Sequence, residues 1–414
     1  MSLGGSVRPV AGAALVAAAL VGGAACAPRA GRATAAPAAH WVGSWAASPQ
    51  LVEPRNLPPA PGLAGHTLRQ VVHLSLGGAP IRVRVANTFG DGPVTIGAAR
   101  IARSAGGDSI VPGTSQVIRF GGAPSVTIAA GATATSDPLD VDVAPLGDLT
   151  VSTYVESMPP DVTGHPGSRT TSFIEAGDAT AERTMHGAVR VEHWYLLAGI
   201  DVIAPAGSAA VVALGNSITD GRGSGTDRND RWPDELARRL AADPRTATVA
   251  VLNAGIGGNA VLRGGLGPTA LDRLDRDALD QPGVRWLIVL EGVNDIGTAA
   301  PDSSAATADA LVAAYRQIAD RAHRRGLRVY GATILPFGGS FYDHPAREAA
   351  RQRVNAWIRT AGAFDAVIDF DAALRDPAAP SRLVSSADGG DHLHPNEAGY
   401  SQMASAVDLS LFQP

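Results

Sequence analysis

The stretch 209-AAVVALGNSITDG-221 carries an apolar run straight into a Gly-Asn-Ser turn. A near-continuous apolar run of this length is typical of a strand whose sheet is covered on both faces. Ser217, placed directly after such a strand, is expected at the exposed edge of the sheet, with its backbone N–H free to point at a bound oxygen. A single serine in a turn is also a common helix cap, so this stretch needs support from others.

Four more apolar runs follow, and longer stretches with apolar residues at helical spacing separate them. We expect strands at 209–214, 248–254, 284–290, 328–335 and 366–370, and helices at 233–242, 303–325 and 345–362. Strands that alternate with helices and connect right-handedly form a doubly wound α/β layer. Its ligand cleft lies at the carboxyl ends of the strands. Residues 206–414 are therefore predicted to form an α/β domain with a parallel sheet.

The preceding part of the chain has a different hydrophobic pattern. Short segments of alternating polarity, at 81–89, 94–102, 125–130 and 148–157, are separated by Gly, Pro and Asp turns. This pattern indicates antiparallel sheets. Residues 41–205 are therefore predicted to form an all-β accessory domain, a sandwich or jelly roll.

The N-terminus indicates export. Arg8 precedes a run of small apolar residues from 10 to 25, which is too short for a stable membrane span but suits a signal peptide at 1–26. Residues 27–40, rich in Ala, Pro and Arg, are expected to be a flexible linker. The only cysteine, Cys26, leaves two alternatives: an ordinary cleavage site in a secreted protein, or a lipid anchor at the cell surface. We favour secretion.

Composition agrees with a globular protein. Of the 414 residues, 45% are hydrophobic and 18% are charged, which is enough apolar material for packed cores. The net charge of −5 gives no reason to expect a nucleic-acid partner. With a single cysteine the chain contains no internal disulfide, so its domains depend on packing alone.

Three further segments stand after predicted strands, where such a sheet has its active site. They are 253-NAGIGGNAV-261, 290-LEGVNDIG-297 and 388-DGGDHLHPNEAGY-400. Asp391 and His394 are three residues apart, so a turn can bring the carboxylate to one imidazole nitrogen while the other faces the cleft. His392 and His394 with Asp388 or Asp391 also resemble a metal-ligand cluster, but no further ligand pair stands near the other strand ends. No metal or cofactor is expected.

Taken together, GNSITDG, NAGIGGN, GVND and DHLH resemble, in that order, the four sequence blocks of the SGNH hydrolase family, also called GDSL esterases. The resemblance covers about residues 209–411 and implies a three-layer, flavodoxin-like α/β domain. It makes Ser217 the nucleophile, with His394 as base and Asp391 as its orienting acid. Gly258 and Asn294 then join the N–H of Ser217 in the oxyanion hole. One departure is visible, since Asn216 replaces the aspartate that usually precedes the serine.

The expected function is that of a secreted serine esterase for short-chain carboxylic esters, with acetyl esters of carbohydrates as one candidate class. Two alternatives stay open: a lipase or lysophospholipase, and a non-catalytic carbohydrate-binding surface protein. The loop 220–232 is expected to shape the mouth of the cleft, and Phe337, Phe341 and Tyr342 to wall an acyl or sugar site. Two tryptophans in 41-WVGSWAASPQ-50 either stack on a sugar or fill the junction of the domains, and we favour the second.

Overall fold

A computed structural model describes residues 39–413. The predicted signal peptide at 1–26, with Cys26, and the predicted linker up to residue 38 lie outside these described residues. His40, the last residue of the predicted linker, is already the first residue of strand β1 (His40–Ala46), where it pairs with Ala204.

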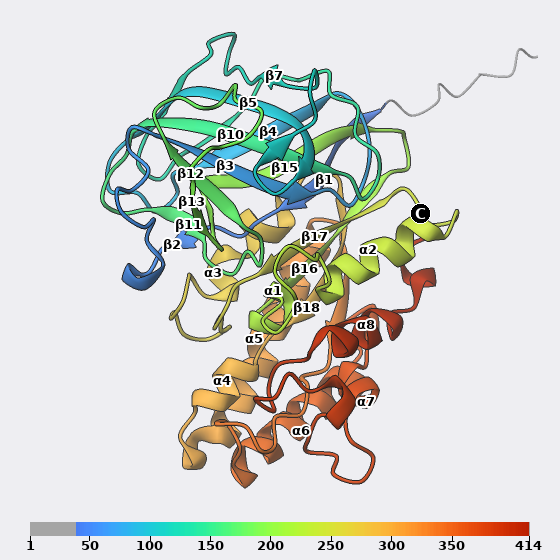
Figure 1. Cartoon of the computed structure of the whole chain (residues 1–414). Coiled ribbons are helices and arrows are strands. Elements are labelled where there is room, and N and C mark those ends of the chain that lie inside the picture. Colours follow the sequence, from blue (N-terminus) through green and yellow to red (C-terminus); the bar gives the residue numbers. More distant parts are fainter. Residues whose placement is uncertain (1–38, 414) are drawn as a thin grey trace, which may run out of the picture. The chain divides into compact units, whose positions relative to one another are not determined.

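The first part of the described chain is rich in β-structure (Figure 1). Its four-stranded sheet has the order β1, β15 (Leu197–Ala204), β4 (Ile81–Ala86) and β9 (Thr133–Thr135). The larger sheet runs β13 (Val189–Val191), β12 (Ser172–Ala176), β3 (His66–His73), β10 (Asp148–Ser157), β5 (Val94–Gly106) and β6 (Ser109–Ile110), with β7 (Gln116–Val117) and β8 (Val126–Ile128) also on β5. A small sheet joins β14 (Trp194–Tyr195), β11 (Thr163–His165) and β2 (Gln50–Leu51).

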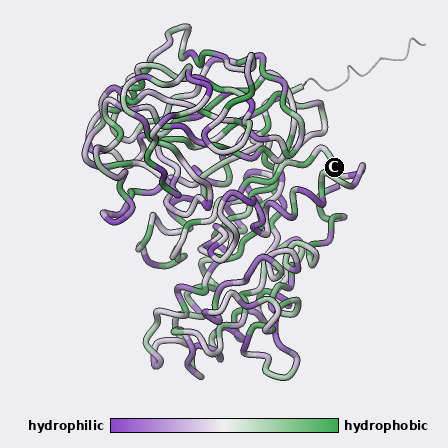
Figure 2. The backbone as a smooth tube through the Cα atoms, in the orientation of Figure 1, coloured by the Kyte–Doolittle hydropathy of each residue, from purple (hydrophilic) through white to green (hydrophobic). Residues whose placement is uncertain are grey.

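Alternating polarity explains these strands. On β5, Val94 and Ile96 are buried, while Thr95 and Gly97, which alternate with them, are partly exposed. Figure 2 shows hydrophilic and hydrophobic residues following one another along the strands of this part. Because successive side chains point to opposite faces, one face of each strand joins a core and the other faces outward. The prediction of a β-rich N-terminal domain is confirmed, while its closer description as a sandwich stays a prediction.

The second part contains a five-stranded sheet whose strands are all parallel. Its order is β17 (Val249–Gly255), β16 (Ala209–Gly215), β18 (Val284–Leu290), β19 (Arg328–Ala332) and β20 (Ala366–Ile368). Every residue of β16 is buried, as its continuous apolar sequence predicts. All five strands lie where the sequence placed them, although β19 and β20 end earlier than predicted.

The helices form two groups, and within each group the helices pack against one another. One contains α2 (Trp232–Ala242), α7 (Phe370–Leu374) and α8 (Glu397–Ser405), and the other contains α3 (Ala270–Leu274), α4 (Val293–Thr298), α5 (Ser304–Arg324) and α6 (Pro345–Thr360). A single helical turn, α1 (Ser217–Asp220), follows β16. The predicted α/β class is confirmed, and the finer assignment to a flavodoxin-like three-layer fold stays a prediction. None of the helices in the described part of the chain is long and apolar enough to cross a bilayer.

The two parts are joined by direct contacts. The N–H of Gly43 on β1 donates to the carbonyl of Pro282, and Ser75 Oγ accepts the N–H of Val251 on β17 at 3.0 Å. Residues 39–413 belong to one compact unit. The β-rich part is thus held against the sheet that carries the predicted active site.

Candidate active site

Ser217 is the first residue of α1, and only Asn216 separates it from the end of β16. The backbone of Asn216 is extended, with φ −100° and ψ −154°, and its side-chain oxygen accepts the N–H of Ile218 at 3.1 Å. This cap turns the chain sharply out of the strand. Ser217 is 8% exposed and lines a cavity of about 310 Å³.

Asp391, His394 and Ser217 form a continuous chain of hydrogen bonds. Ser217 Oγ lies 2.8 Å from His394 Nε2, and His394 Nδ1 lies 2.7 Å from Asp391 Oδ2. Asp391 Oδ1 also accepts the backbone N–H of His394 at 2.9 Å, so the three-residue turn holds the carboxylate against the ring. Because an ionised carboxylate only accepts, Nδ1 carries the proton. Nε2 is then free to accept the hydroxyl proton of Ser217.

The pKa values of the pair favour this state. Burial lowers the pKa of His394 below its ordinary value of 6.5; the hydrogen bond and charge of Asp391 oppose the shift, and the positive charges of Arg222 and Arg169 add to it. Burial by itself would raise the pKa of Asp391, but hydrogen bonds from His394 lower it below the usual range. At neutral pH the imidazole is therefore neutral and the carboxylate is ionised.

Gly258 lies in the turn that follows β17. Its φ is +72°, in the left-handed region that side-chain-bearing residues rarely adopt, and an added Cβ would lie only 2.9 Å from Leu266. It lines the same cavity as Ser217 and His394. The sequence prediction that a glycine here brings backbone close to the ligand fits this geometry.

Asn294, in the first turn of α4, also lines the cavity. Its Nδ2 donates to the carbonyl of Asn259 at 2.7 Å, and its Oδ1 accepts the hydroxyl of Tyr342 at 3.0 Å. An amide Nδ2 has two hydrogens, so one remains for a ligand. Two partners on opposite ends of the amide fix which end is oxygen and which is nitrogen.

The departure at position 216 has a physical reason. Asn216 Nδ2 donates to Oε2 of Glu291 and to the carbonyl of Leu290, both at 3.3 Å. Burial raises the pKa of Glu291 to about 8, even with Arg273 beside it. An aspartate at 216 would bring a second carboxylate against this buried acid, whereas an amide donates to it.

The β-rich part contributes to the cavity wall, which the sequence did not predict. Residues from both parts of the chain line the cavity: Gln50, Glu53, Arg55, Asn56, Pro166, Gly167, Arg169 and His193 from the first, and Asp220, Arg222, Gly257, Leu266, Phe341, Tyr342 and Leu393 beside the predicted site residues from the second. The mouth of the site is therefore built jointly.

A buried ion pair crosses the junction behind the predicted nucleophile. His165 Nε2 on β11 lies 2.8 Å from Asp220 Oδ1 at the end of α1, and His165 Nδ1 lies 2.9 Å from the carbonyl of Ser48. Both partners are acceptors, so both ring nitrogens carry protons. Burial opposes this charge, but the charge and hydrogen bond of Asp220, together with the hydrogen bond to the Ser48 carbonyl, outweigh burial and raise the pKa of His165. His165 and Asp220 are 55 residues apart, so no local sequence pattern predicts that they form a pair.

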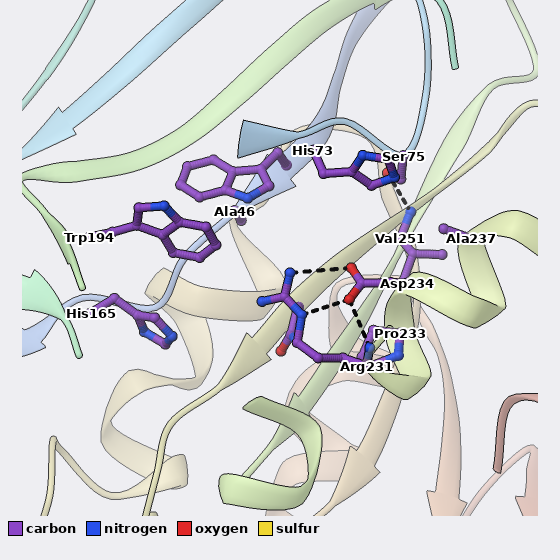
Figure 3. A pocket seen from close by; sticks show the side chains of 12 residues that line it. Ala46, His73, Ser75, His165, Trp194, Arg231, Pro233, Asp234, Ala237 and Val251 are labelled. Atoms are coloured by element: carbon purple, nitrogen blue, oxygen red, sulfur yellow. Dashed lines mark hydrogen bonds and ion pairs between the residues drawn. The ribbon is translucent and has the colours of Figure 1, made fainter. Parts of the chain in front are cut away.

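A smaller pocket adjoins this pair (Figure 3). Trp45 is buried there and meets Trp194 edge-on, with ring centres 4.8 Å apart. Arg231 lies over the other ring, 5.8 Å from the Trp194 centroid, and its Nε pairs with Asp234 at 2.6 Å. Trp45 thus fills the junction, as the favoured sequence interpretation had it for both tryptophans. Trp41 is partly exposed instead, and the guanidinium of Arg82 lies 4.4 Å from its ring centroid.

The three aromatic residues after β19 behave differently from one another. Phe341 is 70% exposed and lines the cavity together with Tyr342. Phe337 is fully buried and does not line it, so the prediction that it walls the site is wrong. Its apolar ring joins the core because the chain turns only after this residue, between 338 and 344.

The predicted loop 220–232 reaches the site through Asp220 and Arg222. His392, considered above as a metal ligand, turns instead to Asp388, with Nδ1 2.5 Å from Oδ2. Within residues 39–413 no group of three or more His, Cys, Asp or Glu side chains is arranged to hold a metal ion.

The family model described as GDSL-like Lipase/Acylhydrolase matches residues 213–402. Residues 213–402 are a GDSL-like acylhydrolase domain. The resemblance expected from the four blocks is thereby confirmed, and the family makes the domain an ester hydrolase, with small esters as its class of substrate. None of the curated proteins matches the chain.

Solved structures similar to this GDSL-like domain include an acetylxylan esterase from Geobacillus stearothermophilus, 21% identical, which covers 48% of this chain and 93% of that one with a TM-score of 0.37. An acetyl xylan esterase named AlAXEase is 18% identical, with 48% and 96% coverage and a TM-score of 0.37. A GDSL-like lipase from Bacteroides thetaiotaomicron VPI-5482 is 18% identical, with 48% and 84% coverage and a TM-score of 0.34.

Proposed function

We propose that this protein is a serine esterase that cleaves short-chain carboxylic esters through an acyl-enzyme. The observation that carries the proposal is the hydrogen-bonded chain from Asp391 through His394 to Ser217, which ends in a cavity that Gly258 and Asn294 also line. A nucleophile, a base, an orienting acid and oxyanion donors are the parts that acyl transfer requires.

In the first half-reaction Ser217 Oγ attacks the ester carbonyl while its proton passes to His394 Nε2. The carbonyl π electrons move to the oxygen, and Asp391 stabilises the imidazolium that forms. The tetrahedral intermediate then collapses: the bond between carbon and the alcohol oxygen breaks, and His394 returns its proton to the departing alcohol. The product is an acyl ester of Ser217.

Three donors would stabilise the oxyanion: the backbone N–H groups of Ser217 and Gly258 and the free Nδ2 hydrogen of Asn294. Donors that are already fixed avoid the reorganisation that water would need. Losing one such donor typically costs about 3 kcal/mol of barrier, or roughly a hundredfold or more in rate.

In the second half-reaction a water molecule takes the place of the alcohol. His394 accepts its proton as the water oxygen attacks the acyl carbon, and the same donors hold the second oxyanion. Collapse releases the carboxylic acid and returns the proton to Ser217 Oγ. No step requires a cofactor or metal.

The substrate is proposed to be a small ester, with acetylated carbohydrate as the candidate natural class. The cavity of about 310 Å³ has polar and charged side chains over much of its wall, which suits a polar alcohol better than a long acyl chain. The lipase or lysophospholipase alternative predicts the opposite dependence on acyl length.

Export is also part of the proposal. The N-terminal segment 1–26 has the charge and apolar run of a signal peptide, and we propose secretion, with a lipid anchor at Cys26 as the alternative. Mass spectrometry of the exported protein separates the two, because a lipidated Cys26 adds acyl mass to the mature N-terminus.

The proposed activity is tested with 4-nitrophenyl esters of two to sixteen carbons. We expect turnover to be highest for the shortest esters and to fall by at least about 10⁴-fold in Ser217→Ala. Ser405→Ala, at an exposed serine of α8, is the matched control. Equal rates for both variants contradict the role of Ser217, and a rate that rises with acyl length favours the lipase alternative.

A further inference from the structure

Three arginines line the active-site cavity, and they come from both parts of the chain: Arg55 and Arg169 from the β-rich part, and Arg222 from the loop after α1. Among the described residues, none of the three guanidinium groups has a carboxylate within ion-pair distance or a hydrogen-bond acceptor. The Nε of Arg169 is also buried, and it has no hydrogen-bond partner among residues 39–413. Buried donors left unsatisfied are costly, so this group requires an acceptor.

The acidic side chains on the cavity wall are already engaged. Glu53 accepts Nε2 of Gln50 at 2.8 Å and Nδ2 of Asn56 at 2.9 Å, one on each oxygen. Asp220 is paired with His165. Glu53 keeps its negative charge, because amides are neutral, but it is one carboxylate against three arginines. The cavity wall therefore carries an excess of positive charge.

Arg169 and Arg222 are held in place by their backbones. The carbonyl of Arg169 accepts the N–H of Asp227, whose carboxylate in turn accepts the N–H and hydroxyl of Thr171, both at 2.7 Å. The carbonyl of Arg222 accepts the hydroxyl of Tyr400 at 2.6 Å. The two loops that carry the arginines are thus tied to each other and to α8.

Arg222 is next to a residue that packs against His394, and Arg169 lines the same cavity close enough for its charge to act on His394. The residue after Arg222, Gly223, is so close to His394 and Pro395 that an added Cβ would lie 2.5 Å from the Pro395 carbonyl oxygen. In the proposed reaction His394 Nε2 gives its proton to the departing alcohol, so the alcohol part of the ester must lie beside His394. We therefore infer that the arginines lie nearer to the alcohol part of the ester than to its acyl group.

We propose that the esterase selects esters whose alcohol part carries an anionic group, and that Arg169 and Arg222 bind this group. The inference rests on the function proposed above and deepens it. Guanidinium groups bind both carboxylate and phosphate with paired hydrogen bonds, so this chemistry suits either anion. An O-acylated sugar acid or sugar phosphate has this chemistry.

The same placement affects the base. The positive charges of Arg169 and Arg222 help to lower the pKa of His394, in addition to the larger effect of burial. An anion bound between them offsets that charge, and so makes His394 a stronger base when the preferred substrate is present. Anionic esters should therefore have a higher kcat as well as a lower KM.

The test compares two esters that release nearly the same phenol: 4-acetoxybenzoate, which is anionic, and its neutral methyl ester. A third, 4-acetoxyphenyl phosphate, distinguishes phosphate from carboxylate as the preferred group. The kcat/KM ratio of anionic to neutral ester is measured for the wild type, for Arg169→Gln/Arg222→Gln, and for Arg103→Gln. Arg103 on β5 is an exposed arginine outside the cavity and is the matched control.

We expect the wild type to prefer at least one anionic ester, and the double variant to lower that ratio by about tenfold or more, an effect that weakens with added salt. Arg103→Gln should keep the wild-type ratio. A ratio that the double variant does not change overturns the inference, while Ser217-dependent cleavage of the neutral ester leaves the esterase proposal standing. If the wild type cleaves none of the three esters, both proposals fall.

Discussion

Tyr342→Phe tests how the oxyanion hole is held together. The substitution removes one hydroxyl, which donates to Asn294 Oδ1 at 3.0 Å, and leaves the ring in place. Without it, among the hydrogen bonds formed within residues 39–413, the one from Asn294 Nδ2 to the Asn259 carbonyl alone orients the amide. A single hydrogen bond of this kind contributes about 1 kcal/mol, so kcat should fall roughly fivefold. KM should change little, because the lost contact acts on the transition state.

A double-mutant cycle makes the argument specific. Asn294→Ala alone should lower kcat by on the order of a hundredfold or more, because it removes the donor itself. In that background Tyr342→Phe should have no further effect, since the amide it orients is gone. Tyr154→Phe is the control, because no hydrogen bond of the Tyr154 hydroxyl occurs in residues 39–413. Turnover of 4-nitrophenyl acetate is the assay, and an equal loss from Tyr342→Phe in both backgrounds refutes the reasoning.

Three further predictions concern charge. Because burial lowers the pKa of His394, kcat/KM should fall only at acidic pH, where the imidazole is protonated, and the midpoint of that fall should lie below pH 6.5. A midpoint above pH 6.5 contradicts this. The raised pKa of His165 means that its pair with Asp220 stabilises the fold fully below about pH 6.5 and progressively less as pH rises through the folded-state pKa. His165→Gln should therefore lower the free energy of unfolding by about 3 kcal/mol at pH 6, measured by urea titration, and by less at high pH; a gap that widens with pH is the contrary result. Asn216→Asp should cost about 1–3 kcal/mol of stability beside Glu291, and Glu291→Gln in that variant should restore part of it.

The parallel sheet and the predicted triad were accessible from the sequence because their signals are local. Each strand of the sheet is a short apolar run, and parallel strands bring their carboxyl ends to one edge. Ser217, Gly258 and Asn294 follow three such ends, so the topology gathers them without any knowledge of side-chain packing. Asp391 and His394 are neighbours in the chain, and one turn is enough to pair them.

The contributions of the β-rich part were not accessible, because they depend on how two cores pack. Neither His165 nor Arg169 stands in a segment with a recognisable pattern, and each acquires its role only through contact with residues about 55 positions further along the chain. Phe337 was misplaced for a similar reason, since composition alone does not tell which of several aromatic residues turns into the core. Tyr342 was predicted near the site, but its bond to Asn294 was not.

The central claim is that Ser217 is a nucleophile activated by His394. Intact-protein mass spectrometry after treatment with a fluorophosphonate tests it directly. We expect one added phosphonyl group, located at Ser217 by peptide mapping, with labelling abolished in Ser217→Ala and strongly slowed in His394→Ala. A folded wild-type protein that takes up no label, or one labelled at a different serine, would contradict it.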